Sequence, residues 1–148
     1  MDYEYFMSLA LEEAKKAYDK NEVPIGCIIV LEGEIIGKGH NLRNSLKNAL
    51  YHAELIAIDE ACKKIDDWRL ENAAIFITVE PCAMCAGAIV QARIKDVIYG
   101  AYNHKFGSGG SILNILEEER FNHQCNVIKE VMLEECENIM KDFFKRFR

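Results

Sequence analysis

The pattern of hydrophobic and polar positions predicts an alternation of helices and strands along the chain. Apolar residues recur at helical spacing between residues 2 and 20, which predicts a first helix. Two apolar runs, residues 26–31 and 34–38, flank the turn signal Glu32-Gly33 and predict a β-hairpin. The other predicted elements are helices at 52–65, 82–93 and 132–147, strands at 73–79, 96–100 and around Val127, and a short helical segment at 112–118.

The order of these elements predicts an α/β fold. Residues 73–79 form a nearly uninterrupted apolar run, which is typical of a strand that is covered on both faces. Successive strand–helix–strand units favour right-handed crossovers, with helices on both faces of one sheet. A three-layer α/β/α sandwich is the simplest arrangement. Because the sequence has no linker-like or repeated segment, we expect residues 1–148 to form a single domain.

The composition is that of a soluble globular protein rather than a disordered chain. Half of the 148 residues are hydrophobic, 28% are charged, and the formal net charge is −6. Proteins that bind nucleic acid non-specifically along its phosphates are usually basic, so any such contact here must be local. The clearest basic stretch, residues 141–148, is either a solvated helix end or a contact for an anionic partner.

Features of membrane proteins and secreted proteins are missing from the sequence. The first residues, Met1 to Glu4, are acidic and lack the basic and then apolar layout of a signal peptide. No apolar run approaches the roughly 20 residues that span a bilayer. We therefore expect a cytoplasmic protein without membrane attachment, in which thiols stay reduced.

The six cysteines fall into two groups. Four are isolated among apolar neighbours and are predicted to be small core residues: Cys27, Cys62, Cys125 and Cys136. Cys82 and Cys85 instead follow Pro81 at a predicted helix start, three residues apart, so one ion can bind both from a single helical turn. The helix dipole and the free N–H groups at that end stabilise thiolates, the form that binds a metal.

A second motif, His52-Ala53-Glu54, lies at another predicted helix start and completes a zinc site. His52 would be the third ligand beside the two cysteines, and three protein ligands leave the fourth tetrahedral position open for water, as in catalytic zinc sites. Glu54 would take a proton from that water and pass protons to a ring nitrogen and the leaving amine. The combined pattern is the signature of zinc-dependent nucleobase deaminases, in which the glutamate is not a ligand.

Two simpler interpretations of the cysteine pair fit less well. A structural zinc site needs a fourth ligand, whereas His40, His104 and His123 lie in unpaired contexts. A redox-active cysteine pair leaves His52 and Glu54 without a role.

The residues around these motifs resemble one family. The segments 78–88 (TVEPCAMCAGA), 51–54 (YHAE) and 22–26 (EVPIG) are similar to those of bacterial tRNA-specific adenosine deaminases, which convert the wobble adenosine of a tRNA anticodon to inosine. The resemblance continues through Gly107–Ser111 and Phe121–His123 to Phe143–Arg146 and so covers nearly the whole chain. The zinc motifs alone are shared with guanine and cytosine deaminases.

The resemblance implies a cytidine-deaminase-like fold with a mixed five-stranded sheet. It implies a homodimer in which the partner helps to complete the substrate site, one Zn²⁺ per subunit on His52, Cys82 and Cys85, and Glu54 as the proton shuttle. The implied partner is tRNA, through its anticodon stem–loop. Hydrolytic deamination of the wobble adenosine is therefore the leading functional hypothesis.

The resemblance also implies a set of substrate-binding residues: Asn41, Ala53, Asn103, Lys105, Phe144 and Arg146. Asn41 would hydrogen-bond the nucleoside. Without the resemblance, the sequence favours a turn residue at the end of a strand. The Gly107–Ser111 loop would follow an RNA backbone through main-chain N–H groups, or it is a flexible surface connection. Phe143, Phe144 and Phe147 cannot share one helical face, so we expect at least one to be exposed and available for stacking.

Asn103 stands where the family usually has an aspartate. Losing a carboxylate near a polyanion would remove repulsion and add a donor, so we hypothesise a looser discrimination between RNA and DNA.

Two other functions remain open from the sequence. The first is deamination of free guanine, cytosine or a nucleoside, which the acidic net charge mildly favours. The second is a zinc-stabilised binding module without catalysis. Glu54 argues against the binding module, because a structural metal site has no use for an unligated carboxylate.

Overall fold

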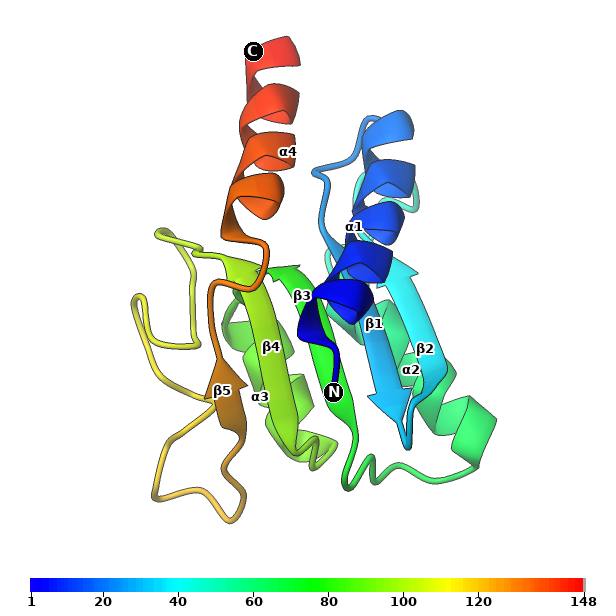
Figure 1. Cartoon of the computed structure of the whole chain (residues 1–148), viewed down its shortest axis with the longest axis vertical. Helices are drawn as coiled ribbons and strands as arrows, with labels where there is room; N and C mark the ends of the chain where they lie inside the picture. Colours follow the sequence, from blue (N-terminus) through cyan, green and yellow to red (C-terminus); the bar gives the residue numbers. More distant parts are fainter. Residues whose placement is uncertain (148) are drawn as a thin grey trace.

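In the computed structural model, residues 1–147 are described, and they form a five-stranded sheet between two pairs of helices (Figure 1). In chain order the elements are α1 (Tyr3–Asp19), β1 (Gly26–Leu31), β2 (Glu34–His40), α2 (Ala53–Ile65), β3 (Ala74–Val79), α3 (Ala83–Gln91), β4 (Asp96–Ala101), β5 (Asn126–Ile128) and α4 (Leu133–Arg146). Arg148, the last residue of the predicted basic end, lies outside the described residues.

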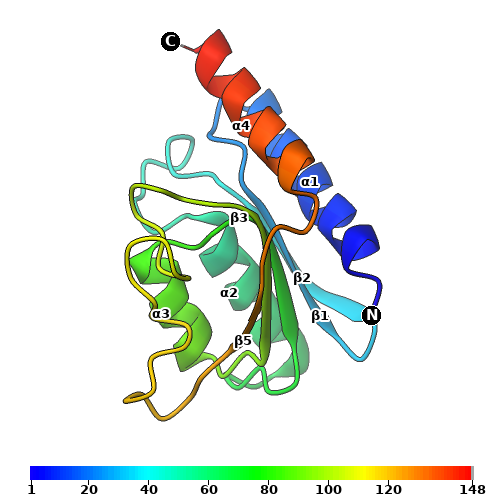
Figure 2. The ribbon, with the colours of Figure 1, turned by 60° about the vertical axis from the view of Figure 1, so that its left-hand side comes forward.

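The sheet is mixed, as predicted. Its strand order is β2-β1-β3-β4-β5, with β1 antiparallel to both of its neighbours. The pairs β3–β4 and β4–β5 are parallel. Only β1 runs in the opposite direction, so the other four strands all end at the same edge of the sheet. Figure 2 shows α2 and α3 on one face and α1 and α4 on the other. This arrangement confirms the three-layer α/β/α sandwich.

The two faces of the sheet carry separate hydrophobic cores. Alternate residues of the central strands point to opposite faces, so that Ile75 and Ile77 of β3 face α2 and α3 while Phe76 packs toward α1. Every residue of β3 is buried, which explains the uninterrupted apolar run in its sequence.

The backbone of α2 lies unusually close to β2. A Cβ atom on Gly39 would come within 2.2 Å of the carbonyl oxygen of Ala53, and one on Gly37 within 2.3 Å of that of Ala57. These glycines are required because only a residue without a side chain allows such an approach. As a result, the first turn of α2 is held beside the end of β2, at the edge where β3 also ends.

Two predictions from the sequence are wrong in detail. Residues 112–118 form turns rather than a helix, because their backbone bonds to other segments: the Ile115 N–H donates to Ser108, and the Leu116 carbonyl accepts from Cys125. Of the four cysteines predicted to lie in the core, Cys62 is only half-buried. Within residues 1–147, none of the helices combines the length and apolar character needed to cross a bilayer.

Candidate active site

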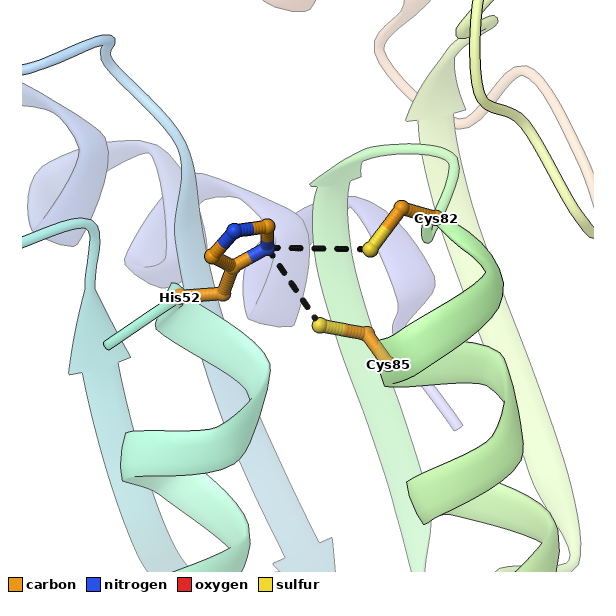
Figure 3. A group of neighbouring side chains, drawn as sticks. All are labelled: His52, Cys82 and Cys85. Carbon is orange, nitrogen blue, oxygen red and sulfur yellow. Dashed lines mark hydrogen bonds between the residues drawn. The ribbon is translucent and has the colours of Figure 1, made fainter. Parts of the chain in front are cut away.

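Three potential metal ligands meet where α2 and α3 begin. His52 is the N-cap residue of α2, Cys82 is the N-cap residue of α3, and Cys85 follows in the first turn of α3. The Nδ1 atom of His52 lies 3.7 Å from Sγ of Cys82 and 3.6 Å from Sγ of Cys85 (Figure 3). All three ligand-type atoms lie within 4.8 Å of one another. The structure thus brings together the residues that sequence spacing predicted as a metal site.

The two sulfurs are electrostatically unequal. A hydrogen bond from Cys85, followed by one from His52, lowers the pKa of the Cys82 thiol to about 4. The pKa of Cys85 is raised, because its thiol donates to Cys82 and because it is buried. The hydrogen bond with Cys82 also raises the pKa of His52. Cys82 is therefore the sulfur that ionises more readily, and a divalent ion bound to both would displace the proton of Cys85.

The donor set fits zinc. Two thiolates and one imidazole are ligands that zinc favours over hard cations such as Mg²⁺. A set of three protein ligands leaves the fourth tetrahedral position to a non-protein ligand. His52, Cys82 and Cys85 are thus the residues that would hold the ion.

Glu54 lies in the first turn of α2, beside the ligand group, and only 4% of it is exposed. Burial raises the pKa of its carboxyl to about 7, although the charge on His52 and a hydrogen bond with Cys85 act in the opposite direction. A carboxyl group in this range exchanges protons readily near neutral pH, which is the property required of a general acid–base catalyst.

A cavity of about 580 Å³ opens next to these groups. Five of the six residues predicted to bind substrate line it: Asn41, Ala53, Asn103, Lys105 and Phe144. They come from the end of β2, from α2, from the segment after β4 and from α4, which the fold brings to one edge of the sheet. Arg146 does not line the cavity, because its guanidinium lies over the rings of Tyr18 and Phe147. Phe143 is buried whereas Phe144 and Phe147 are exposed, in agreement with the prediction.

Asn41 combines the two roles that the sequence left open. Its Oδ1 atom accepts the N–H of Arg43 at 3.0 Å, and its Nδ2 atom donates to the Val23 carbonyl at 3.3 Å. It therefore fixes a turn after β2. The same buried side chain also lines the cavity, where it can meet a bound molecule.

Sequence reasoning missed Glu80, which follows β3 and is only 1% exposed. Its carboxylate accepts the backbone N–H of Asn103 at 3.1 Å and those of Gly109 and Ser111 at 3.0 Å each, as well as the Ser111 hydroxyl. It lies two residues before Cys82, so it ties the segment after β4 to the metal-site helix. The only signal in the sequence was an acidic residue directly after a buried apolar strand.

These bonds contradict one prediction about the Gly107–Ser111 loop. Its main-chain N–H groups are not available to an RNA backbone, because all five donate within the protein. Those of Gly109 and Ser111 donate to the Glu80 carboxylate, and the other three donate to the carbonyl groups of Asn103, Pro81 and Leu113. Nor is it a flexible surface connection, since Gly107, Ser108 and Gly109 are buried around the Glu80 carboxylate.

A family model described as MafB19-like deaminase matches residues 1–148. The tRNA-specific adenosine deaminase of Bacillus subtilis (strain 168) is 49% identical over 145 residues, which cover 98% of this chain and 90% of that protein. The chain belongs to the MafB19-like deaminase family, among the tRNA-specific adenosine deaminases. The resemblance deduced from the sequence is therefore confirmed.

Solved structures agree with the assignment of this chain to the deaminase family. A structure from studies of A-to-I editing by tRNA:A34 deaminases at the wobble position of transfer RNA superposes with a TM-score of 0.87 at 37% identity, covering 91% of this chain and 98% of that one. A guanine deaminase from Nitrosomonas europaea superposes with a TM-score of 0.83 at 18% identity, covering 95% of this chain and 83% of that one. The second likeness concerns the fold alone.

Proposed function

We propose that this deaminase hydrolyses the wobble adenosine in the anticodon loop of tRNA to inosine and releases ammonia. The observation that carries the proposal is the buried carboxylate of Glu54 beside the His52, Cys82 and Cys85 group, in the wall of a cavity. Membership of the tRNA-specific adenosine deaminases supports the choice of substrate.

A zinc ion held by His52, Cys82 and Cys85 would supply a Lewis acid that acidifies the attacking water. The carboxylate of Glu54 can hold the proton that the water gives up, and can pass protons to the purine ring nitrogen and to the departing amine. One water is consumed and one ammonia leaves, so Glu54 returns to its starting state after each turnover.

The size and lining of the cavity suit a base that has left its stack. Enzymes that act on a base in nucleic acid must extrude it into a pocket, at a cost that is smallest in an unpaired loop. The volume of about 580 Å³ lies within the usual range for small-molecule sites. The cations Arg43 and Lys105 line the same cavity, so a chain of net charge −6 still offers local attraction to phosphates.

The proposal includes a cytoplasmic homodimer of single-domain chains, each with one Zn²⁺. Exposed apolar side chains near the cavity-lining segments supply area for such an interface: Leu46, Leu50, Ile112 and Leu113. Sedimentation equilibrium of the purified protein measures the oligomeric state, and a monomer at micromolar concentration would contradict the dimer.

The decisive test is incubation with an anticodon stem–loop that carries a wobble adenosine, scored for inosine. Free guanine, cytosine and adenosine are assayed in parallel. We expect inosine in the stem–loop and no comparable turnover of the free compounds. Faster release of ammonia from a free base would favour the alternative, deamination of small molecules. A zinc-loaded protein that deaminates none of them would support the non-catalytic binding module.

Asn103 permits a finer test of substrate choice. Its Oδ1 atom accepts the N–H groups of Lys105 and Phe106, and an aspartate can accept both bonds equally well. Asn103→Asp should therefore keep the turn while restoring a negative charge at the cavity. We expect the variant to discriminate more strongly between matched RNA and DNA hairpins; identical ratios would refute the hypothesis.

A further inference from the structure

Phe106 is the most exposed large hydrophobic residue of the described chain, and it lines the cavity of the candidate active site. Its exposed fraction is 69%, and that of Phe144, which lines the same cavity from α4, is 48%. Single exposed apolar residues are common on protein surfaces. Phe106 differs from them in its position, because it lines the cavity where the substrate base would lie.

The backbone of Phe106 is held firmly although its side chain is exposed. Its N–H donates to Oδ1 of Asn103 at 3.1 Å, and the next N–H, that of Gly107, donates to the Asn103 carbonyl at 2.9 Å. The N–H of Asn103 in turn donates to the buried carboxylate of Glu80. The turn from Asn103 to Gly107 is therefore a fixed support that presents the Phe106 ring.

Within residues 1–147, the Phe106 ring has no aromatic partner. His104 stacks on Tyr102 with ring centroids 6.1 Å apart and an interplanar angle of 29°. Among the ring pairs that residues 1–147 form, none includes Phe106. An exposed aromatic face on a rigid turn gains nothing for folding, but it loses little conformational entropy when a planar group stacks on it.

The surrounding charge indicates which planar group that is. Lys105 precedes Phe106, is exposed, and lines the cavity together with Arg43. An aromatic ring next to a cation, continuous with a base-sized cavity, is the combination by which proteins bind single-stranded nucleic acid: the ring stacks on a base and the cation meets the phosphate.

We propose that Phe106 forms a subsite for the unpaired nucleobase directly adjacent to the target adenosine, with Lys105 facing the intervening phosphate. This proposal rests on the proposed function, because it takes the target base to occupy the cavity. Every nucleobase presents a flat face, so the subsite contributes affinity for a splayed single strand without selecting its sequence.

The first experiment compares steady-state kinetics of inosine formation on the stem–loop for the native protein, Phe106→Ala, Phe106→Leu and Phe106→Tyr. We expect Phe106→Ala to raise KM on the order of ten- to hundred-fold, the range for one stacked base, with kcat nearly unchanged. Phe106→Tyr should restore the native KM, whereas Phe106→Leu should not. Tyr5→Ala is the matched control, since it removes an exposed aromatic ring of α1 that does not line the cavity.

The second experiment identifies the stacked base by replacing the nucleotide on each side of the target with an abasic one. At one of the two positions, we expect the native protein to lose about as much kcat/KM as Phe106→Ala loses on the intact loop. When that nucleotide is abasic, the kcat/KM of Phe106→Ala should fall little below its value on the intact loop, because the variant has already lost the stacking interaction.

The outcomes separate the two proposals. If Phe106→Ala matches the native KM, or if its loss adds fully to both abasic losses, the subsite is refuted while the proposed function stands. If the native protein forms no inosine in the intact loop, the proposed function fails and the subsite fails with it. Phe106→Ala should unfold at the native temperature, since the exposed ring packs against no other ring.

Discussion

Two buried carboxylates, Glu54 and Glu80, line the same cavity and differ in their electrostatic surroundings. At Glu54, at the start of α2, burial raises the pKa to about 7. At Glu80, at the end of β3, burial acts in the same direction, but hydrogen bonds from Ser111, Asn103 and Gly109 outweigh it and lower the pKa. Both side chains are nearly inaccessible to solvent, but burial dominates at Glu54 whereas the hydrogen bonds dominate at Glu80.

This contrast separates a group that can exchange protons from one that holds structure. A carboxylate with few donors in a dry site binds and releases a proton easily, whereas one surrounded by N–H groups stays charged. Glu54 is therefore suited to chemistry. Glu80 is suited to fixing the wall of the cavity in which the chemistry takes place. The predictions below test that division from the largest expected effect to the smallest.

Glu54→Gln should abolish most activity without unfolding the protein. Glutamine keeps the size of the side chain but cannot carry the proton, and general acid–base catalysis contributes about 10²–10⁴-fold. Elemental analysis should show unchanged zinc, since Glu54 is not among the three ligand-type residues. Glu60→Gln, an exposed change on the same helix, is the control. Retention of more than a tenth of the activity would contradict the assignment.

Glu80→Ala should mainly reduce stability. It leaves the buried N–H group of Gly109 and the partly buried ones of Asn103 and Ser111 without their acceptor, and an unsatisfied buried group costs about 1–3 kcal/mol. We expect the free energy of unfolding, measured in urea, to fall by about 3 kcal/mol or more. Glu54→Gln should leave it nearly unchanged. Equal losses for the two variants would remove the distinction between the sites.

Gly107→Ala perturbs the same wall without touching a charge. A Cβ atom at this position would lie 2.3 Å from the Asn103 carbonyl oxygen and 2.6 Å from the Glu80 carboxylate. We expect a loss of about 1–3 kcal/mol, the usual cost of overpacking. Gly87→Ala in α3 is the matched control, because nothing lies within 4 Å of its Cβ and alanine favours helix by about 0.5–1 kcal/mol.

Glu13, on α1, extends the comparison to a third buried carboxylate. A hydrogen bond with His40 and, after it, contacts with Lys16 lower the pKa of Glu13 to about 2, although burial acts in the opposite direction. The other ring nitrogen of His40 faces Lys20. Because the folded-state pKa lies below the ordinary 4.5, the stability that Glu13 contributes is fully present above about pH 5 and is lost as the pH falls toward 2.

Glu13→Gln should therefore lower the free energy of unfolding by about 1–2 kcal/mol at pH 7, and the difference from the native protein should shrink between pH 5 and pH 3. Urea unfolding across that range measures it. Glu12→Gln, an exposed neighbour on α1, should show no pH-dependent difference. A difference for Glu13→Gln that stays constant with pH would show that its partners do not hold the carboxylate charged.

The sequence predicted most of the fold and the metal group because both depend on short-range patterns. The spacing of Cys82 and Cys85 and the proline before them determine a helix start with two sulfurs on one side. The failed prediction of a helix at 112–118 has the opposite reason. Its apolar residues have helical spacing, but the backbone there bonds to distant segments, which local periodicity does not record.

Glu54 and Glu80 illustrate what the sequence by itself determined and what only the tertiary structure decided. The role of Glu54 could be predicted from the sequence, because it stands next to a candidate metal ligand and the other two ligands, Cys82 and Cys85, have a recognisable spacing. Glu80 gained its role only when the segment from Asn103 to Ser111 folded onto the end of β3. The position of Phe106 at the cavity was decided in the same way. Hydrogen-bond donors and cavity walls come from residues far apart in the chain, and only close packing of the whole fold brings them together.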